Sequence, residues 1–181
     1  MEYVYQLNLP SLQDVLKNDL IDAMDNCYNP ILKINPADYF TDEILTIKNL
    51  NWANGIAFKK PNLFTGPIHI DGYGDNTGND LIWAINWIHG GEGGMQYWSR
   101  NYTESLSYDV ASLPRLDVKA TGPADKNYKT DPGKVYLVNA SIPHLAYNTS
   151  MYSSRYAVSI RATNSQLNWQ QVVDLFSDLI I

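Results

Sequence analysis

The chain has 181 residues, of which 45% are hydrophobic and 18% are charged, as in an ordinary globular domain. Its formal net charge of −6 disfavours binding to nucleic acid or to an anionic membrane, because both require clustered positive charge. The single cysteine, Cys27, excludes an intrachain disulfide and suits a reducing compartment. With no signal-like leader and no apolar run of 18 residues, we expect a cytoplasmic protein without a membrane span.

The first 54 residues predict a short strand and then helices that support the rest of the fold. Apolar residues recur at helical spacing from Leu12 to Met24, and Ser11 is a suitable N-cap for this helix. A second helix is expected from about Pro36 to Leu45.

From residue 55 onward, short apolar runs alternate with clusters of Gly, Pro, Asn and Asp, which is typical of an all-β sandwich or barrel. Strands are expected at 55–59, 66–71, 81–88, 94–98, 115–119, 134–139, 144–147 and 155–162. The tail, 168–180, predicts a short amphipathic helix. We therefore expect one mainly β (α+β) domain over 1–181. It has helical support in 1–54, a jelly-roll core of about eight strands in 55–163, and a C-terminal helix in 164–181.

Two metal-capable side chains, His69 and Asp71, lie two residues apart at the end of an expected strand and therefore share one face. His144 opens a later strand and offers a third ligand. Two histidines and one carboxylate form the facial triad that binds non-haem Fe(II) and leaves positions open. The alternative is an ordinary polar strand end. His89 is a weaker ligand candidate, because the glycines around it predict a hairpin tip.

The last expected strand places Arg155, Ser159 and Arg161 on one face. A buried arginine is costly unless an anion pairs with it, and a carboxylate is its best bidentate partner. If this face points into the barrel, a carboxylate ligand beside the metal is the expected partner. The alternative is a surface strand with solvated arginines.

Four segments follow one another in a characteristic order: HID (69–71), GGEGGMQYW (90–98), DPGKVYLVNASIPHLAYN (131–148) and SRYAVSIRA (154–162). Together they resemble the 2-oxoglutarate- and Fe(II)-dependent dioxygenase superfamily, most closely its prolyl-hydroxylase-like branch. The resemblance implies a cupin-like double-stranded β-helix in which the candidate triad ligates Fe(II) and Arg155 holds the distal carboxylate of 2-oxoglutarate. That branch often adds a tyrosine where this chain has Ala84, so Trp83, Tyr147 and Ser159 are the candidates for a further contact.

The reaction implied by the resemblance couples O₂-dependent decarboxylation of 2-oxoglutarate to hydroxylation of a peptide residue or a small molecule. The intact Asp71 favours hydroxylation over halogenation. Residues 75–80 and 99–131 are candidates for a lid and a substrate-facing flap.

Three alternatives remain open. A cupin-type dioxygenase is one, although that class favours more histidine ligands than this chain offers. A repair dioxygenase for alkylated nucleic acid is the second, because the spacing of Arg155 and Arg161 is similar to that family's arginine pair. The third is a catalytically silent jelly roll used for assembly, with the apolar tail Leu179–Ile181 as a homodimer contact.

Overall fold

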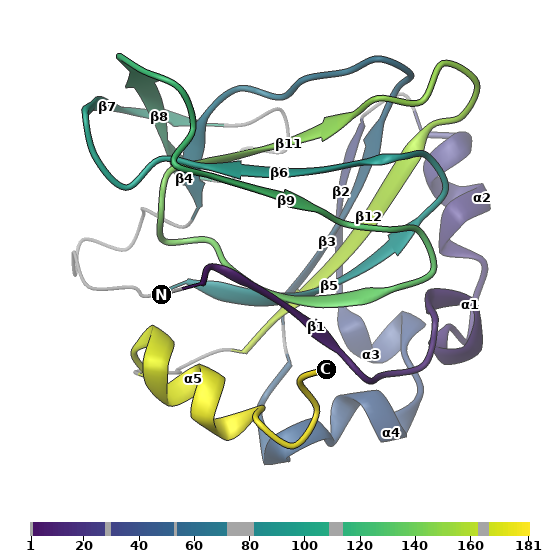
Figure 1. The fold of residues 1–181 in the computed structure, drawn as a ribbon. Coiled ribbons are helices and arrows are strands. Elements are labelled where there is room, and N and C mark those ends of the chain that lie inside the picture. Colours follow the sequence, from purple (N-terminus) through teal and green to yellow (C-terminus); the bar gives the residue numbers. More distant parts are fainter. Residues whose placement is uncertain (1, 28–29, 53, 72–81, 109–113, 163–166) are drawn as a thin grey trace.

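The computed structural model describes residues 2–27, 30–52, 54–71, 82–108, 114–162 and 167–181, and within these ranges it has two antiparallel sheets (Figure 1). The first sheet has the order β1-β10-β5-β12-β3-β2, and the second has the order β7-β8-β4-β11-β6-β9. The strands are β1 Val4–Leu7, β2 Ile31–Ile34, β3 Asn54–Lys60, β4 His69–Asp71, β5 Trp83–His89, β6 Gly93–Tyr97, β7 Tyr102–Tyr108, β8 Pro114–Ala120, β9 Lys126–Lys129, β10 Val135–Asn139, β11 His144–Asn148 and β12 Arg155–Arg161.

The chain passes repeatedly between the two sheets. Strands β3, β5, β10 and β12 form the centre of the first sheet, and β4, β6, β9 and β11 form the matching part of the second. This topology is an eight-stranded jelly roll, or double-stranded β-helix, so the expected fold class is confirmed. Strands β1 and β2 extend the edges of the first sheet, and the hairpin β7–β8 extends the second sheet beyond β4.

The first sheet is buried on both faces, which explains the nearly continuous apolar sequence of β5. Trp83 and Trp87 pack toward the helices, whereas Ala84 and Ile88 pack between the sheets. The larger core therefore lies between the first sheet and the helices. The smaller core shares the barrel interior with the polar residues described below.

The helices are shorter than the sequence predicts. They are α1 Leu12–Val15, α2 Leu20–Asp25, α3 Pro36–Tyr39, α4 Asp42–Leu45, the 3-10 helix η1 Ile47–Asn49 and α5 Trp169–Leu175. The prediction of one helix from Leu12 to Met24 is wrong, because Leu16 is extended and Asp19 starts a new helix by accepting the N–H of Asp22. The second expected helix is likewise divided, between α3 and α4.

The expected flap at 99–131 contains β7, β8 and β9, apart from residues 109–113, which lie outside the described residues. The expected lid at 75–80 also lies outside them. In the tail, Leu179 accepts the N–H of Asn8, and Ile180 bridges to Leu7, so the C-terminus packs along β1 while Ile181 is exposed.

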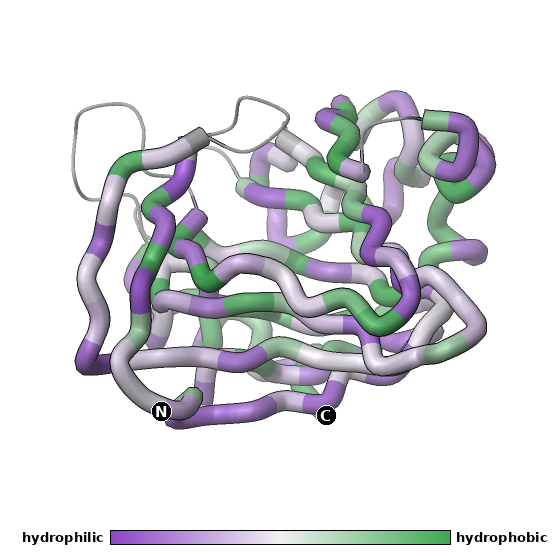
Figure 2. Tube along the Cα trace, turned by 90° about the horizontal axis from the view of Figure 1, so that it is seen from above, coloured by the Kyte–Doolittle hydropathy of each residue, from purple (hydrophilic) through white to green (hydrophobic). Residues whose placement is uncertain are grey.

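Short hydrophobic stretches alternate with hydrophilic ones along the described trace (Figure 2). Consistent with this pattern, none of the described helices has the length and apolar character needed to cross a bilayer.

Candidate metal centre

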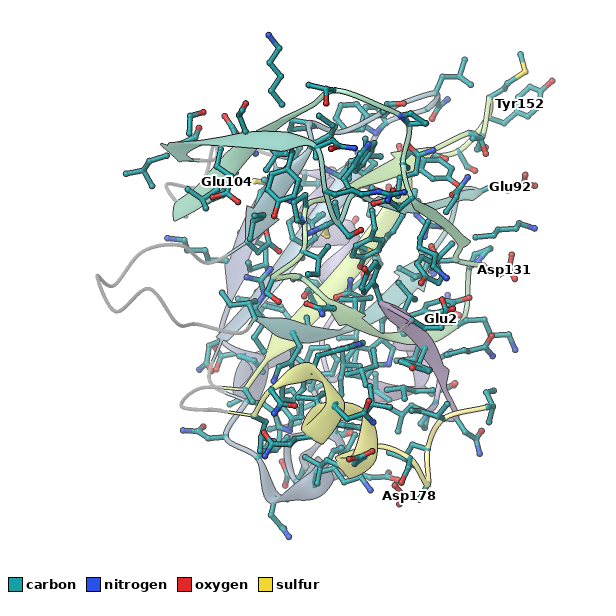
Figure 3. The ribbon with its side chains drawn as sticks, turned by 60° about the vertical axis from the view of Figure 1, so that its left-hand side comes forward. Glu2, Glu92, Glu104, Asp131, Tyr152 and Asp178 are labelled. Atoms are coloured by element: carbon teal, nitrogen blue, oxygen red, sulfur yellow. The ribbon has the colours of Figure 1, made fainter. Side chains whose placement is uncertain are left out.

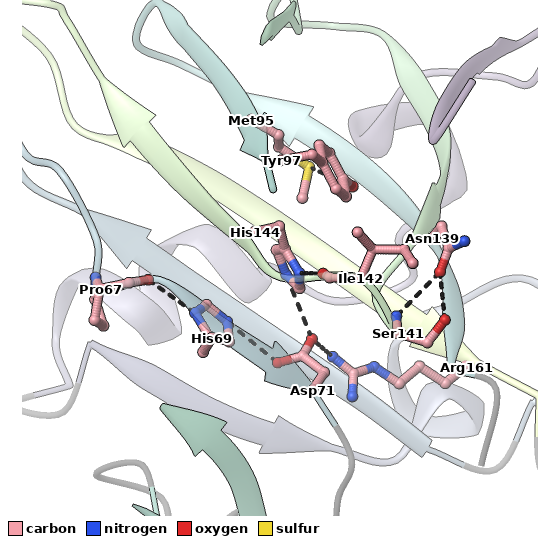
Figure 4. Close-up of polar contacts among 10 residues, drawn as sticks. All are labelled: Pro67, His69, Asp71, Met95, Tyr97, Asn139, Ser141, Ile142, His144 and Arg161. Carbon is pink, nitrogen blue, oxygen red and sulfur yellow. Dashed lines mark hydrogen bonds and ion pairs between the residues drawn. The ribbon is translucent and has the colours of Figure 1, made fainter. Parts of the chain in front are cut away.

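Strands β4 and β11 bring the predicted triad together (Figure 4). His69 and Asp71 lie two apart in β4, and His144 in β11 is paired directly with His69. One ligand atom of each residue lies within 4.8 Å of those of the other two. These three are the only group of this kind among the described residues.

The rings of both histidines are fixed by backbone carbonyl groups. Nδ1 of His69 donates to the carbonyl of Pro67 at 2.9 Å, and Nδ1 of His144 donates to the carbonyl of Ile142 at 2.8 Å. Since a carbonyl only accepts, each neutral ring carries its hydrogen on Nδ1 and has a lone pair on Nε2.

Both Nε2 atoms face the carboxylate of Asp71. Nε2 of His69 lies 3.2 Å from Oδ1, and Nε2 of His144 lies 4.0 Å from Oδ2. Lone pairs directed at a carboxylate repel it, and a cation between them removes that repulsion. The donor set and its orientation therefore fit a divalent metal, with Fe(II) in the two-histidine, one-carboxylate class.

The protonation states also suit metal binding. Burial by itself would raise the pKa of Asp71, but the Arg161 guanidinium holds that pKa well below its ordinary value. Burial and the neighbouring His69 lower the pKa of His144 to about 4. At neutral pH the carboxyl is thus ionised and the His144 ring is neutral, which are the forms that ligate metals.

Arg161, whose role the sequence left open, contacts the triad directly. It lies on β12, and its Nη2 donates to Oδ2 of Asp71 at 2.5 Å. Its side chain is 16% exposed, and its Nε is buried with no hydrogen-bond partner among the described residues. The strand alternation placed Arg161 on the same face as Arg155. It did not reveal the partner of Arg161, because Asp71 lies 90 residues away in β4.

Arg155 lies on the same face of β12 as Arg161 and is 3% exposed. Its Nη2 donates to the hydroxyl of Thr130, while its Nη1 is buried without a hydrogen-bond partner in the described part of the chain. Burial lowers the pKa of Arg155 to about 10, so the group stays cationic at neutral pH. A buried cation with a free donor fits an anionic ligand such as the distal carboxylate of 2-oxoglutarate.

The structure separates the candidates for a further contact with 2-oxoglutarate. Ser159 is 2% exposed on the face of Arg155 and is paired with Asn86, whose Oδ1 is buried without a described partner. Tyr147 is three residues from His144 and therefore points to the opposite face of β11, where its hydroxyl donates to Asn127 at 2.9 Å. Trp83 packs in the helix-side core. Only Ser159 of these three is brought to the interior face.

The structure adds a contact between Tyr97 and one histidine of the triad. Tyr97 is fully buried in β6, pairs directly with His144, and stacks on its ring at a centroid distance of 5.5 Å. His89 lies on the helix side of β5, near the ring of Tyr156, and lines a surface hollow of about 510 Å³ with α1 and α2. It therefore does not join the triad.

No protein-family model and no curated protein matches the chain. Among solved structures, the chain is similar to YcfD, a ribosomal oxygenase from Escherichia coli, with 12% identity and a TM-score of 0.36 over 76% of this chain and 29% of that one. An oxalate oxidase has 13% identity and a TM-score of 0.39 over 77% of this chain and 54% of that one. Procruciferin, an 11S globulin from Brassica napus, has 12% identity and a TM-score of 0.40 over 77% of this chain and 27% of that one.

The chain thus spans about half or less of the length of these structures, and every TM-score is below 0.5. These similarities carry no functional argument. The strand order and the side-chain geometry of this chain define its class: a double-stranded β-helix with a candidate two-histidine, one-carboxylate metal centre.

Proposed function

We propose that the protein is a 2-oxoglutarate- and Fe(II)-dependent dioxygenase that hydroxylates a small molecule or a peptide residue in the cytoplasm. The balanced reaction converts substrate, 2-oxoglutarate and O₂ into hydroxylated substrate, succinate and CO₂. The observation that carries the proposal is the buried guanidinium nitrogen Nη1 of Arg155, which has no hydrogen-bond partner among the described residues. It lies on the interior face that also carries Arg161, the partner of Asp71.

The co-substrate fits because it has two acidic ends with different requirements. Its keto-acid end would bind the metal that His69, Asp71 and His144 would hold, because three protein ligands leave coordination positions open. Its distal carboxylate would take the Nη1 donor of Arg155, with Ser159 on the same face. When bound, the iron supplies O₂ activation and oxidation of the substrate.

The remaining residues hold this arrangement and keep it dry. Arg161 fixes the orientation of Asp71 through Oδ2, which leaves Oδ1 facing His69. Tyr97 and Met95 pack between the sheets beside His144 and exclude water from that side of its ring.

The acidic surface supports a substrate other than nucleic acid. Glu92, Glu104 and Asp131 lie exposed on the outside of the molecule (Figure 3), where they would repel a phosphate backbone. The second arginine that a repair dioxygenase shares is engaged here with Asp71.

The test combines metal binding with turnover in the absence of a primary substrate. Fe(II) affinity is measured anaerobically, and succinate formation from 2-oxoglutarate is then followed with O₂ and ascorbate. His144→Ala should weaken metal binding by at least about 100-fold and abolish succinate formation, because it removes a ligand.

His89→Ala is the matched control, since it removes a histidine outside the triad, and it should retain both properties. A wild-type protein that binds no Fe(II) and forms no succinate would refute the proposed function.

A further inference from the structure

Strand β8 continues the face of the candidate metal centre beyond β4. Asp117 is paired directly with His69, and Arg115 is paired directly with Asp71. Directly opposite residues of an antiparallel pair point to the same face, and adjacent strands lie about 4.8 Å apart. The hairpin β7–β8 lies beside β4 at one end of the second sheet (Figure 1). Arg115 and Asp117 therefore stand next to the metal ligands, on the side away from His144.

The two side chains form a partly exposed ion pair. Nε of Arg115 lies 2.8 Å from Oδ1 of Asp117, and both of these atoms are buried. The side chains are 21% and 39% exposed. A ligand arriving from solvent therefore meets the other nitrogen atoms of the guanidinium and the second oxygen atom of the carboxylate, which keep hydrogen-bonding capacity for it.

The charge of the pair selects the kind of ligand. A ligand with a single charge that bonded one partner would leave the other partly buried and without a counter-charge, which is costly. A ligand with neighbouring opposite charges gives a carboxylate to Arg115 and an ammonium group to Asp117. The nearby carboxylate of Asp71 does not compete for Arg115, because Arg161 already engages it.

We infer that Arg115 and Asp117 form the primary-substrate subsite and that the substrate is a free α-amino acid, held by its carboxylate and its ammonium group. This inference rests on the proposed function, because it names the substrate class of the same centre. It assigns the hairpin β7–β8 a role in specificity, with the side chain of the amino acid directed along the sheet toward the metal ligands of β4.

The first experiment needs no variant. The wild-type protein with Fe(II), 2-oxoglutarate and ascorbate is given each free L-amino acid, and in parallel its N-acetyl and its C-amide derivative. At least one free amino acid should stimulate succinate formation and gain 16 daltons. Blocking either end of that amino acid should raise KM roughly 10- to 100-fold, because one charge-assisted hydrogen bond is lost.

The second experiment assigns each end to its residue. In Arg115→Gln the KM ratio between the amide and the free acid should fall toward one, and in Asp117→Asn the same should happen for the acetyl and free-amine pair. If Arg115 and Asp117 only stabilised the fold, Arg115→Gln would not lower the amide ratio alone and Asp117→Asn would not lower the acetyl ratio alone. Arg100→Gln is the control, since its side chain is 77% exposed and pairs with Asp125 instead, and it should keep both ratios.

Two outcomes would overturn the inference while leaving the proposed function standing. One is succinate formation by the protein alone with no stimulation by any free amino acid. The other is equal stimulation by free and doubly blocked forms, which would indicate a residue within a peptide. Absence of both iron binding and succinate formation in the wild type would overturn the inference together with the proposed function.

Discussion

Replacing Arg155 with methionine should have opposite effects on ligand affinity and on stability. The guanidinium is 3% exposed, and burial lowers its pKa to about 10, well below the ordinary value for arginine. At about 1.4 kcal/mol per pKa unit, holding this charge inside costs the ligand-free protein about 3 kcal/mol at neutral pH. The hydrogen bond to Thr130 offsets about 1.5 to 3 kcal/mol of that penalty.

Methionine removes both contributions and keeps an unbranched apolar stem, with three fewer heavy atoms than arginine. We therefore expect the free energy of unfolding of the ligand-free variant to be unchanged or higher by about 1 kcal/mol. The 2-oxoglutarate affinity should fall much further. Removing one partner of a buried charge pair costs about 2 to 5 kcal/mol, or roughly 30-fold to several thousand-fold in the dissociation constant.

Urea denaturation of the metal-free protein measures the first quantity, and anaerobic calorimetry of 2-oxoglutarate binding to the Fe(II) form measures the second. Arg100→Met is a matched control, because that arginine is exposed and should leave 2-oxoglutarate affinity unaltered. The reasoning is refuted if Arg155→Met loses iron while keeping 2-oxoglutarate affinity. It is also refuted if the metal-free variant is destabilised by several kcal/mol, because the charge would then have a strong protein partner.

Three further predictions concern the centre and its frame. Folding lowers the pKa of His144 from an ordinary 6.5 to about 4. Between these pH values the unfolded chain therefore binds one more proton than the folded chain. The free energy of unfolding of the metal-free protein should thus rise by up to about 3 kcal/mol as the pH rises from 4 to 6.5. His144→Gln should flatten that part of a urea-midpoint profile, and an unchanged slope would contradict the assignment. Arg161→Gln should move the pH midpoint of metal binding upward, because Asp71 loses the guanidinium that lowers its pKa, and a titration of Fe(II) affinity against pH measures this. Gly93→Ala would place a Cβ 2.0 Å from a main-chain oxygen of β11 and should lower the free energy of unfolding by about 3 kcal/mol, measured by thermal unfolding. Gly122→Ala is the control, because the space around Gly122 is open, and it should change the free energy of unfolding by less than about 0.5 kcal/mol.

The strands that the sequence revealed are those buried on at least one face. All residues of β10 and all but the last residue of β5 are buried, so their apolar runs predicted both strands clearly. The strands β2, β7 and β9 were missed, and all three lie at sheet edges. In β7 and β9, TESLS and KNYK have mostly exposed side chains and carry no apolar period. Their pairing comes from backbone hydrogen bonds to β8 and β6, which local sequence does not record.

The candidate site shows the same division between local and distant information. The two-residue spacing in His69 and Asp71 fixes a shared face locally, so the chelating pair was readable. The same parity rule places Tyr147 opposite to His144, so its role as a co-substrate contact stays a prediction. The partner of Arg161 depended on which strand of the other sheet lies across the barrel, and no periodicity carries that information.

The two cores explain how the barrel interior can hold groups that oppose folding. The helix-side core contains Trp83, Trp87 and Trp169 and supplies most of the apolar burial, whereas the core between the sheets is smaller. That interior keeps Nη1 of Arg155 and Oδ1 of Asn86 buried without a described hydrogen-bond partner. Each such group costs about 1 to 3 kcal/mol until a ligand satisfies it.

A ligand at 100 times its dissociation constant stabilises the native state by about 2.7 kcal/mol, which is the same order as one of these penalties. Iron and 2-oxoglutarate together should therefore raise the unfolding temperature by more than iron alone. Because the gain from 2-oxoglutarate depends on Arg155, that second increment should vanish in Arg155→Met while the increment from iron persists. Equal increments in the two proteins would mean that the co-substrate binds away from the buried guanidinium.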